Sequence, residues 1–246
     1  MDSLHDNNPT SKLITMEYHG NYGNVDPMYF HNTAEPNARV SFYGFTGYPS
    51  GAVDGNYYSG HPYNINQTTI NNRSAITSPF TITLSHKINN NGTIDVTAKA
   101  KAVQAVSGSL KLHMVVVEKR IITRKVEKNG ETHWTNVMKK MLPNQNGTTL
   151  AALWAVNDSA TFNQSWTMQN VYNVDQLAVI AFIQNTTTKE ILQAQFDDSS
   201  LKYNMDINLA DNVYTKFIGK SSTANYTFNA NINSDSADVY EVSLLN

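Results

Sequence analysis

Seven histidines are the side chains in this chain best suited to binding a transition metal, but their spacing argues against such a site. They are His5, His19, His31, His61, His86, His113 and His133. Metal-binding histidines usually come in close facing sets, four residues apart on a helix or two apart on a strand. No pair in this sequence has either spacing, and only His19 with His31, which flank one loop, remains as an alternative. We predict no metal ligands and no cofactor.

The acidic residues form no recognisable catalytic or calcium-binding pattern. Glycoside hydrolysis needs two carboxylates that converge across a cleft, and calcium-binding loops follow a fixed spacing of oxygen ligands. The candidates are Glu118, Glu131 and Asp158 for the first, and Asp197, Asp198, Asp206 and Asp211 for the second. None of them stands in a motif that brings it beside another carboxylate across a cleft. A hydrolase built on a β-sandwich therefore stays a secondary hypothesis.

Other catalytic chemistries are excluded by residue type or by missing motifs. The chain has no Cys, which removes thiolate nucleophiles, disulfides and dithiol redox chemistry. It also lacks the glycine-rich phosphate loop, the dinucleotide-binding fingerprint and the nucleophile elbow of hydrolases. We predict that the chain is not an enzyme and that it has no catalytic residues.

Aromatic residues are the remaining candidates for a binding surface, and they gather near the start of the chain. Eight of them are Tyr22, Tyr29, Phe30, Tyr43, Tyr48, Tyr57, Tyr58 and Tyr63. Rigid tyrosine rings among Gly and Asn are typical of adaptable binding surfaces. Packing between two parts of the protein explains the same residues equally well. The tryptophans Trp134, Trp154 and Trp166 are better suited to the core or to an internal interface.

Composition narrows the class of protein further. The 246 residues are 40% hydrophobic, enough for a sizeable core in one large or two ordinary domains. Only 15% are charged, and the net charge is −2. Without a basic block the chain has no electrostatic basis for binding nucleic acid. No apolar run reaches the length of a membrane-spanning helix.

The pattern of the first 77 residues predicts a small α/β unit, which contains these tyrosines. Residues 2–7 resemble the end of a helix, and residues 12–18 have the alternation of a strand. Residues 33–43 form a predicted helix, with Ala34, Ala38 and Phe42 on one face. A strand at 51–53 and a second helix within 65–77 follow.

From Pro79 onwards the pattern changes to alternating strands. Predicted strands lie at 80–84, 94–102, 110–116, 160–169, 176–184 and 190–196, and Asn90-Asn91-Gly92 is a hairpin turn. In the strand from 110, the side chains of Lys111 and His113 point away from the core-facing residues. The long connection at 123–150, between two of these strands, contains a predicted short helix near 135–142. These strands predict an antiparallel sandwich at 78–204, followed by a C-terminal β segment at 205–246 that completes the sandwich or begins a further module.

The tract YGFTGYPS at 43–50 resembles the corner of thioredoxin-like proteins that places a cis proline before a strand. Pro49 matches that proline, and the strand at 12–18 and the helix at 33–43 match the elements before it. The resemblance implies a partial thioredoxin-like unit at 1–77, without the strand and C-x-x-C helix that would precede Met1. It also implies a binding surface at Tyr48 and Pro49; a rigid structural turn is the alternative. From the tyrosine-rich segment, Tyr43 and Tyr22 are further candidate binding residues.

Several spaced tracts in the middle of the chain resemble the 28-kilodalton outer-membrane-protein (Omp) family of Gram-negative bacteria. They are VVVEK at 115–119, NGET at 129–132, NVMKKMLP at 136–143, GT at 147–148 and AFIQN at 181–185. The resemblance covers residues 10–197. It implies an α+β, β-dominated fold in which a thioredoxin-like segment precedes a sandwich, in a protein that is exported or carries a lipid anchor.

Together these observations predict a non-catalytic binding or structural protein of the cell envelope, in the periplasm, at the outer membrane or at the cell surface. The expected ligand is a protein, a peptide or a glycan. Residues 1–6 contain no export signal, so we expect a fragment of a longer chain, with membrane association only through an anchor upstream of Met1. The alternative is a piece of a thioredoxin-like thiol–disulfide oxidoreductase or chaperone whose cysteines lie upstream.

Overall fold

A computed structural model describes residues 2–21, 26–122, 132–198, 205–209 and 228–232. Contacts within the chain separate two compact units, residues 1–200 and residues 201–246. The predicted boundary between residues 77 and 78 lies inside the first unit and stays a prediction. In the second unit, strands β13 (Met205–Leu209) and β14 (Phe228–Ile232) pair in antiparallel fashion. The rest of the C-terminal β segment predicted at 205–246 lies outside the described residues.

The first unit contains an antiparallel β-sandwich, which confirms the predicted β-dominated α+β fold. Its smaller sheet has the strand order β10-β4-β3, and its larger sheet has the order β12-β11-β6-β7 with β8 beside β6. The strands are β3 (Phe80–Ile88), β4 (Thr93–Ala102), β6 (Leu110–Ile122), β7 (His133–Leu142), β8 (Thr148–Thr149), β10 (Ser159–Thr167), β11 (Leu177–Asn185) and β12 (Ile191–Asp197). Two short strands, β5 (Val106–Ser107) and β9 (Leu153–Trp154), pair at one end of the sandwich, and a 3-10 turn, η2 (Val174–Gln176), precedes β11.

Alternation of side chains along the strands builds the core between the two sheets. In β4, Ile94, Val96 and Ala98 are fully buried, whereas Asp95 and Lys99 between them are exposed. Inward residues of β6 and β11 close the core from the other sheet. Trp134 and Trp154 are buried and Trp166 packs against this core, so the prediction of structural tryptophans is confirmed.

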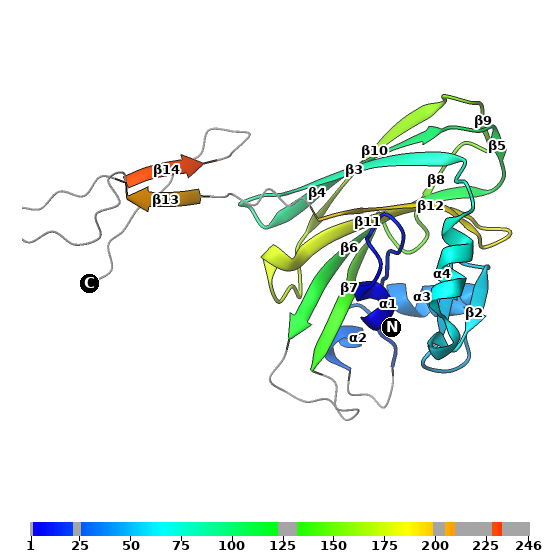
Figure 1. Cartoon of the computed structure of the whole chain (residues 1–246), viewed down its shortest axis with the longest axis horizontal. Coiled ribbons are helices and arrows are strands. Elements are labelled where there is room, and N and C mark those ends of the chain that lie inside the picture. Colours follow the sequence, from blue (N-terminus) through cyan, green and yellow to red (C-terminus); the bar gives the residue numbers. More distant parts are fainter. Residues whose placement is uncertain (1, 22–25, 123–131, 199–204, 210–227, 233–246) are drawn as a thin grey trace, which may run out of the picture. The chain divides into compact units, whose positions relative to one another are not determined.

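The segment before β3, here called the N-terminal layer, covers the opposite face of the larger sheet. This part of the molecule therefore has three layers (Figure 1). Its elements are α1 (Asp2–Asp6), α2 (Pro27–His31), α3 (Ala34–Tyr43), β1 (Gly51–Val53), β2 (Tyr58–Gly60), η1 (Pro62–Asn64) and α4 (Gln67–Ser74). Ile14, Met16 and Tyr18 pack onto Val115, Val117 and Phe182 of the sheet to form a second core. His113, predicted to face away from the first core, is therefore buried in the second.

Three predictions about this layer and the sheet beneath it need correction. The predicted helix at 135–142 is strand β7, and the predicted strand at 12–18 makes only one isolated bridge, from Glu17 to Val137. The helix predicted at 33–43 exists, but it buries Glu35 and Arg39 rather than Ala34 and Phe42.

Candidate functional site

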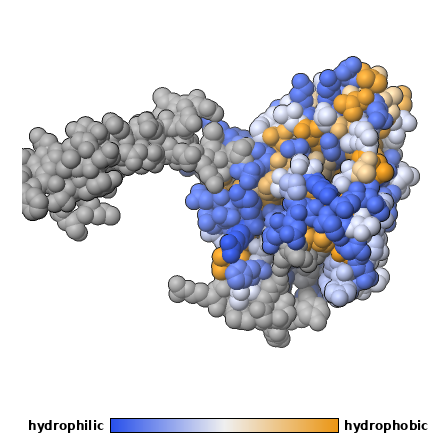
Figure 2. Space-filling model, viewed as in Figure 1, coloured by the Kyte–Doolittle hydropathy of each residue, from blue (hydrophilic) through white to orange (hydrophobic). Residues whose placement is uncertain are grey.

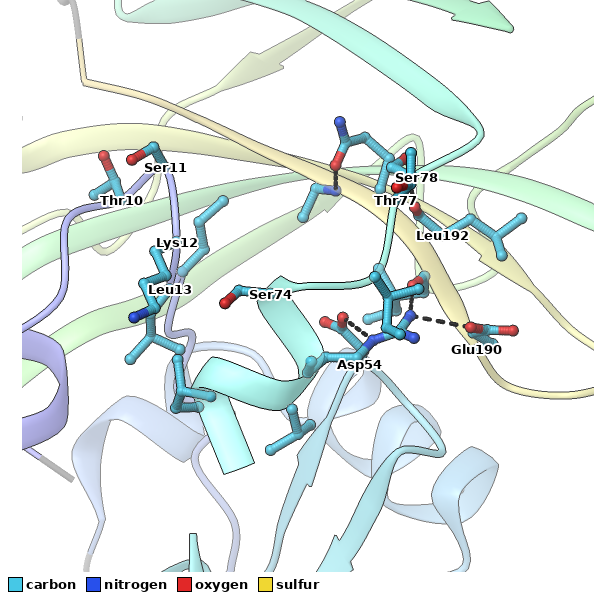
Figure 3. Close-up of a pocket in the computed structure, with 18 of the residues that line it drawn as sticks. Thr10, Ser11, Lys12, Leu13, Asp54, Ser74, Thr77, Ser78, Glu190 and Leu192 are labelled. Carbon is cyan, nitrogen blue, oxygen red and sulfur yellow. Dashed lines mark hydrogen bonds and ion pairs between the residues drawn. The ribbon is translucent and has the colours of Figure 1, made fainter. Parts of the chain in front are cut away.

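A cleft of about 230 Å³ opens where the N-terminal layer meets the edge of the larger sheet (Figure 3). Residues 10–14 form one wall, and α4 with the loop at 76–79 forms the other. The end of β1 and the start of β12 close it. Segments far apart in the sequence therefore meet here, which makes this cleft a candidate ligand site among the described residues.

Arg73, at the C-terminal end of α4, connects the walls of the cleft. Its Nε donates a hydrogen bond to Asp54 Oδ2 at 2.6 Å, and one terminal nitrogen donates to Glu190 Oε1 at 3.0 Å. The same nitrogen reaches the carbonyl oxygen of Ile191 at 3.1 Å. The guanidinium thus joins the helix to the β1–β2 turn and to the start of β12.

The charges of Asp54 and Glu190 favour the protonated form of Arg73. Burial lowers the pKa of Arg73, but the hydrogen bonds and charges of Asp54 and Glu190 outweigh that effect and leave the pKa above its ordinary value. Burial raises the pKa of Asp54, and the nearby guanidinium only partly offsets the rise. Both carboxylates are therefore engaged in ion pairs with the same cation.

Local sequence explains why these three groups meet. Asp54 and Gly55 turn the chain with positive φ angles of 42° and 78°. A Cβ atom at Gly55 would lie 1.8 Å from the carbonyl oxygen of Lys189, so glycine lets this turn press against the β11–β12 turn. Asn66 caps the start of α4 by accepting the Thr69 N–H at 3.0 Å, which fixes the helix that carries Arg73.

The rest of the lining mixes apolar side chains with hydroxyl groups. Leu13, Ile70 and Ile191 contribute apolar surface, and Thr10, Ser11 and Thr77 contribute hydroxyls. Ser78 Oγ donates to the carbonyl oxygen of Leu192 at 2.7 Å, and Lys12 Nζ donates to Asn71 Oδ1 at 2.6 Å. Such walls can hold a ligand through apolar contact and a few hydrogen bonds.

The predicted binding residues lie elsewhere. Tyr48 and Pro49 are exposed, and the peptide bond between them is cis, as the thioredoxin-like resemblance implies. The hydroxyl of Tyr43 is instead engaged inside the protein, where Arg39 donates to it at 2.7 Å and Gln184 at 3.1 Å. Tyr22 lies outside the described residues. Whether Tyr48 and Pro49 contact a ligand stays a prediction.

The two loop histidines serve separate local contacts. His19 Nδ1 lies 2.7 Å from Asp26 Oδ2, and its Nε2 lies 3.8 Å from a carboxylate oxygen of Glu17. The ring of His31 packs against Tyr172 with 5.5 Å between centroids. No group of three or more potential metal ligands occurs among the described residues.

Sequence reasoning missed Arg73, Asp54 and Glu190 as a set. In the sequence, Asp54 and Gly55 are typical of a turn, which is correct for their backbone but does not indicate an ion pair. Its partner Glu190 lies 117 positions after Arg73, so no local spacing signals the contact. The pairing becomes visible only once α4 is docked on the sheet.

Comparison with known proteins identifies the family. A model of the family described as outer membrane protein Omp28 matches residues 36–200. The chain belongs to this family. The match confirms the resemblance seen in the spaced tracts of the sequence and makes the chain an outer-membrane-associated protein of the cell envelope. No curated protein matches the sequence.

Two of the solved structures that resemble the chain come from Porphyromonas gingivalis. One is described as HBP35 of Porphyromonas gingivalis, with a TM-score of 0.58 and 14% identity over 90% of this chain and 73% of that chain. The other is a domain of the outer membrane lipoprotein Omp28 from Porphyromonas gingivalis, with a TM-score of 0.34 and 10% identity over 50% of this chain and 88% of that one. The first likeness supports the fold of this Omp28 member. In the described ranges, no helix has the length and apolar character needed to cross a bilayer.

Proposed function

We propose that this Omp28-family chain is a non-catalytic binding module of the cell envelope and that the cleft around Arg73 receives part of its ligand. The observation that carries the proposal is that both carboxylates in the cleft, Asp54 and Glu190, are bound to Arg73. A hydrolase would need at least one of them free to exchange a proton with a substrate or to attack it.

The size of the cleft points to a small portion of a ligand rather than a whole substrate. Enzyme and cofactor pockets commonly measure about 300–1,000 Å³, whereas this cleft measures about 230 Å³. That volume suits one or two side chains of an extended peptide. Leu13 and Ile70 offer apolar contact for such a segment, and the hydroxyls of Thr10 and Ser11 offer hydrogen bonds.

We also propose that residues 1–77 are a thioredoxin-like unit that has kept its architecture without redox chemistry. The order α3, Pro49, the β1–β2 hairpin and α4 supports this assignment. The absence of a regular strand at 12–18 is the departure from that architecture, since this segment crosses the sheet instead of pairing within one. With no Cys in the chain, thiol–disulfide exchange by these residues is not expected.

A peptide-binding experiment tests the proposed module. Arrayed extended peptides are screened against the 246-residue chain, and the strongest are titrated while backbone amide NMR signals are recorded. We expect the signals of Leu13, Ile70 and Ile191 to shift together. A cleft-filling variant, Ser74→Phe, should weaken binding, whereas Ser85→Phe on the far, solvent-facing side of β3 should not.

Activity assays test the alternative that the chain is a hydrolase. Chromogenic glycosides and esters should not be turned over by the wild-type chain. Turnover that disappears in both Asp54→Asn and Glu190→Gln would show a hydrolase and overturn the proposal. Peptide-induced shifts confined to other surfaces would assign the binding elsewhere and reject the cleft.

A further inference from the structure

An uncharged, apolar surface lies at the end of the sandwich that carries β5 and β9. Residues 102–110 and 141–157 contain no charged side chain. Their exposed apolar residues are Val103, Ala105, Ala151, Ala152, Leu153, Ala155 and Val156, here called the apolar end. Leu153 is 76% exposed, Val156 55% and Val103 41%. Figure 2 shows hydrophobic residues gathered at this end of the molecule.

The two loops of the apolar end are held on a well-ordered frame. Val106 and Ser107 pair with Trp154 and Leu153, and Gly108 donates its N–H to the carbonyl oxygen of Ala152 at 3.0 Å. The buried Trp154 ring packs edge-on against Phe80 with 5.4 Å between centroids, and its Nε1 donates to Ala151 O at 3.0 Å. The fold therefore presents these apolar side chains to solvent at fixed positions.

Lysines surround the apolar end without balancing acids. Lys101 and Lys111 flank the first loop, residues 102–110. Lys99 lies two residues before Lys101, on the same exposed face of β4. None of these three lysines forms an ion pair with a described residue. Asp158, the acid next to the second loop, is already engaged, because its Oδ2 accepts the N–H of Ala155 at 2.7 Å.

Hydroxyl groups complete the surface behind the apolar end. The pairing register sets Lys101 between Thr81 and Ser159, and it sets Lys99 between Thr83 and Thr161. All of these side chains are exposed, and successive rows on one face of a strand are about 7 Å apart. Each ammonium group thus has hydroxyl donors on both sides, an arrangement that suits phosphate oxygens.

From this arrangement we infer that the apolar end docks on the surface of a lipid bilayer with anionic headgroups. Leu153, Val156 and Val103 enter the boundary between headgroups and acyl chains, and the lysines with their hydroxyl neighbours contact the phosphates. Protein-binding hot spots are rich in Trp, Tyr and Arg and poor in Lys. The apolar end has the opposite composition, so a lipid surface fits it better than a protein partner does. This contact is independent of the Arg73 cleft and adds to any upstream anchor.

Vesicle sedimentation tests the inference with the 246-residue chain. Vesicles of phosphatidylethanolamine and phosphatidylglycerol are compared with vesicles of phosphatidylcholine alone. We expect binding to the anionic vesicles that weakens as salt is raised. Leu153→Ser combined with Val156→Ser should weaken it about tenfold or more. Tyr63→Ser, at a side chain 89% exposed on η1, is the matched apolar control and should bind like wild type.

The contribution of the lysines to vesicle binding is tested separately. Lys101→Gln and Lys111→Gln should each weaken binding about fivefold, whereas Lys87→Gln, at the other end of β3, should change it little. The inference is overturned if wild type ignores anionic vesicles, or if the Leu153 and Val156 variant binds them as strongly as wild type. It is also overturned if light scattering shows a dimer that this variant abolishes while vesicle binding stays absent, because the apolar end would then join two copies of the chain.

Discussion

At the scale of single residues, the N-terminal layer is attached to the sheet by buried polar groups. Glu35 is 2% exposed and accepts hydrogen bonds from Asn32 Nδ2 at 2.6 Å, from the Met141 N–H at 2.7 Å and from Lys140 Nζ. Arg39 donates to Gln184 at 2.9 Å and packs over the ring of Phe182. Specific pairing, rather than an apolar stripe, therefore orients α3.

Replacing Glu35 tests this attachment. Glu35→Ala leaves the Met141 N–H and the Lys140 ammonium without their acceptor, and we expect a loss of about 2–4 kcal/mol in the free energy of unfolding. Glu35→Gln keeps a neutral acceptor for the Met141 N–H and should lose about half as much. Urea denaturation followed by tryptophan fluorescence measures both variants. Equal stability of Glu35→Ala and wild type would show that the pairing does not hold the layer.

His19 gives the N-terminal layer a dependence on pH. Burial lowers the pKa of His19, but the hydrogen bond and charge of Asp26, with Glu17, outweigh burial and raise the pKa to about 9. Asp26 also caps α2 by accepting the N–H groups of Met28 and Tyr29. Because the folded pKa lies above the ordinary value of 6.5, the stabilisation is complete below pH 6.5 and is lost as the pH rises through about 9.

We therefore expect wild type to lose about 2–3 kcal/mol of stability from this group between those limits. His19→Gln should be less stable than wild type at pH 6 and should approach it near pH 10. His133→Gln, at an exposed histidine of β7, is the control and should follow the wild-type profile. Denaturation across the pH range measures all three, and a His19 ring signal that titrates near 6.5 would contradict the assignment.

At the scale of elements, two turns that meet edge to edge position the cleft. Gly55 in the β1–β2 turn touches the carbonyl of Lys189 in the β11–β12 turn, and the Ile191 N–H donates to Asp54 O at 2.9 Å. The Asn56 side chain donates to Thr188 O at 3.0 Å. The hairpin is thereby fixed to the start of β12, which sets the distance from Arg73 to both carboxylates.

Two Gly→Ala substitutions separate the stability cost of a steric clash from the cost of a positive φ angle. Gly55→Ala combines a positive φ of 78° with a clash against Lys189, and we expect it to cost about 3 kcal/mol or more. Gly92→Ala has a similar φ of 80° but meets nothing within 4 Å, so it should cost only about 1–2 kcal/mol. Thermal unfolding measures the pair. Equal losses would mean that the two turns do not press together in solution.

The sequence predicted most strands correctly and failed where an element departs from simple alternation. In β7 the apolar residues Trp134, Val137 and Met141 have the spacing of a helix. The cause is irregular pairing, since Asn136 has a φ of 51° and the register with β6 shifts near Val117. A bulge moves side chains from one face to the other, so a bulged strand buried on both faces imitates helical periodicity.

The segment at 12–18 failed for a different reason. Ile14 and Tyr18 alternate as in a strand, and they do point to one side, onto the second core. Alternation reports an extended chain with one buried face, but it does not report what the backbone pairs with. Here the chain lies across the sheet, and its backbone joins β7 only at Glu17, through hydrogen bonds with Asn136 and Met138.

At the scale of the whole molecule, the part that the sequence could not assemble is the cleft. Lys12, Arg73 and Glu190 come from three distant segments whose meeting depends on how the N-terminal layer docks. Motif reasoning found the family, because its three longest tracts follow single strands, β6, β7 and β11. The thioredoxin-like resemblance of one short tract, residues 43–50, placed the predicted binding surface at Tyr48 and Pro49. The residues of the cleft are close only in space, so no such tract marks them.

The core clusters of the described residues lie in the first compact unit. The two larger buried clusters and the smaller one around Trp134 all draw their members from residues before 200. The Omp28 family match also ends at residue 200, where the contacts divide the chain. The family match and the division of contacts therefore end at the same residue, and we expect residues 1–200 to fold on their own.

Truncation tests that boundary. A chain that ends at Ser200 keeps every strand of the sandwich, and we expect its free energy of unfolding to lie within about 1 kcal/mol of the full chain. A chain that ends at Lys189 loses β12, exposes the backbone of β11 and leaves Arg73 without Glu190, so it should not unfold cooperatively. Differential scanning calorimetry compares the three chains. Loss of the cooperative transition in the chain ending at Ser200 would mean that residues 201–246 are part of the sandwich fold.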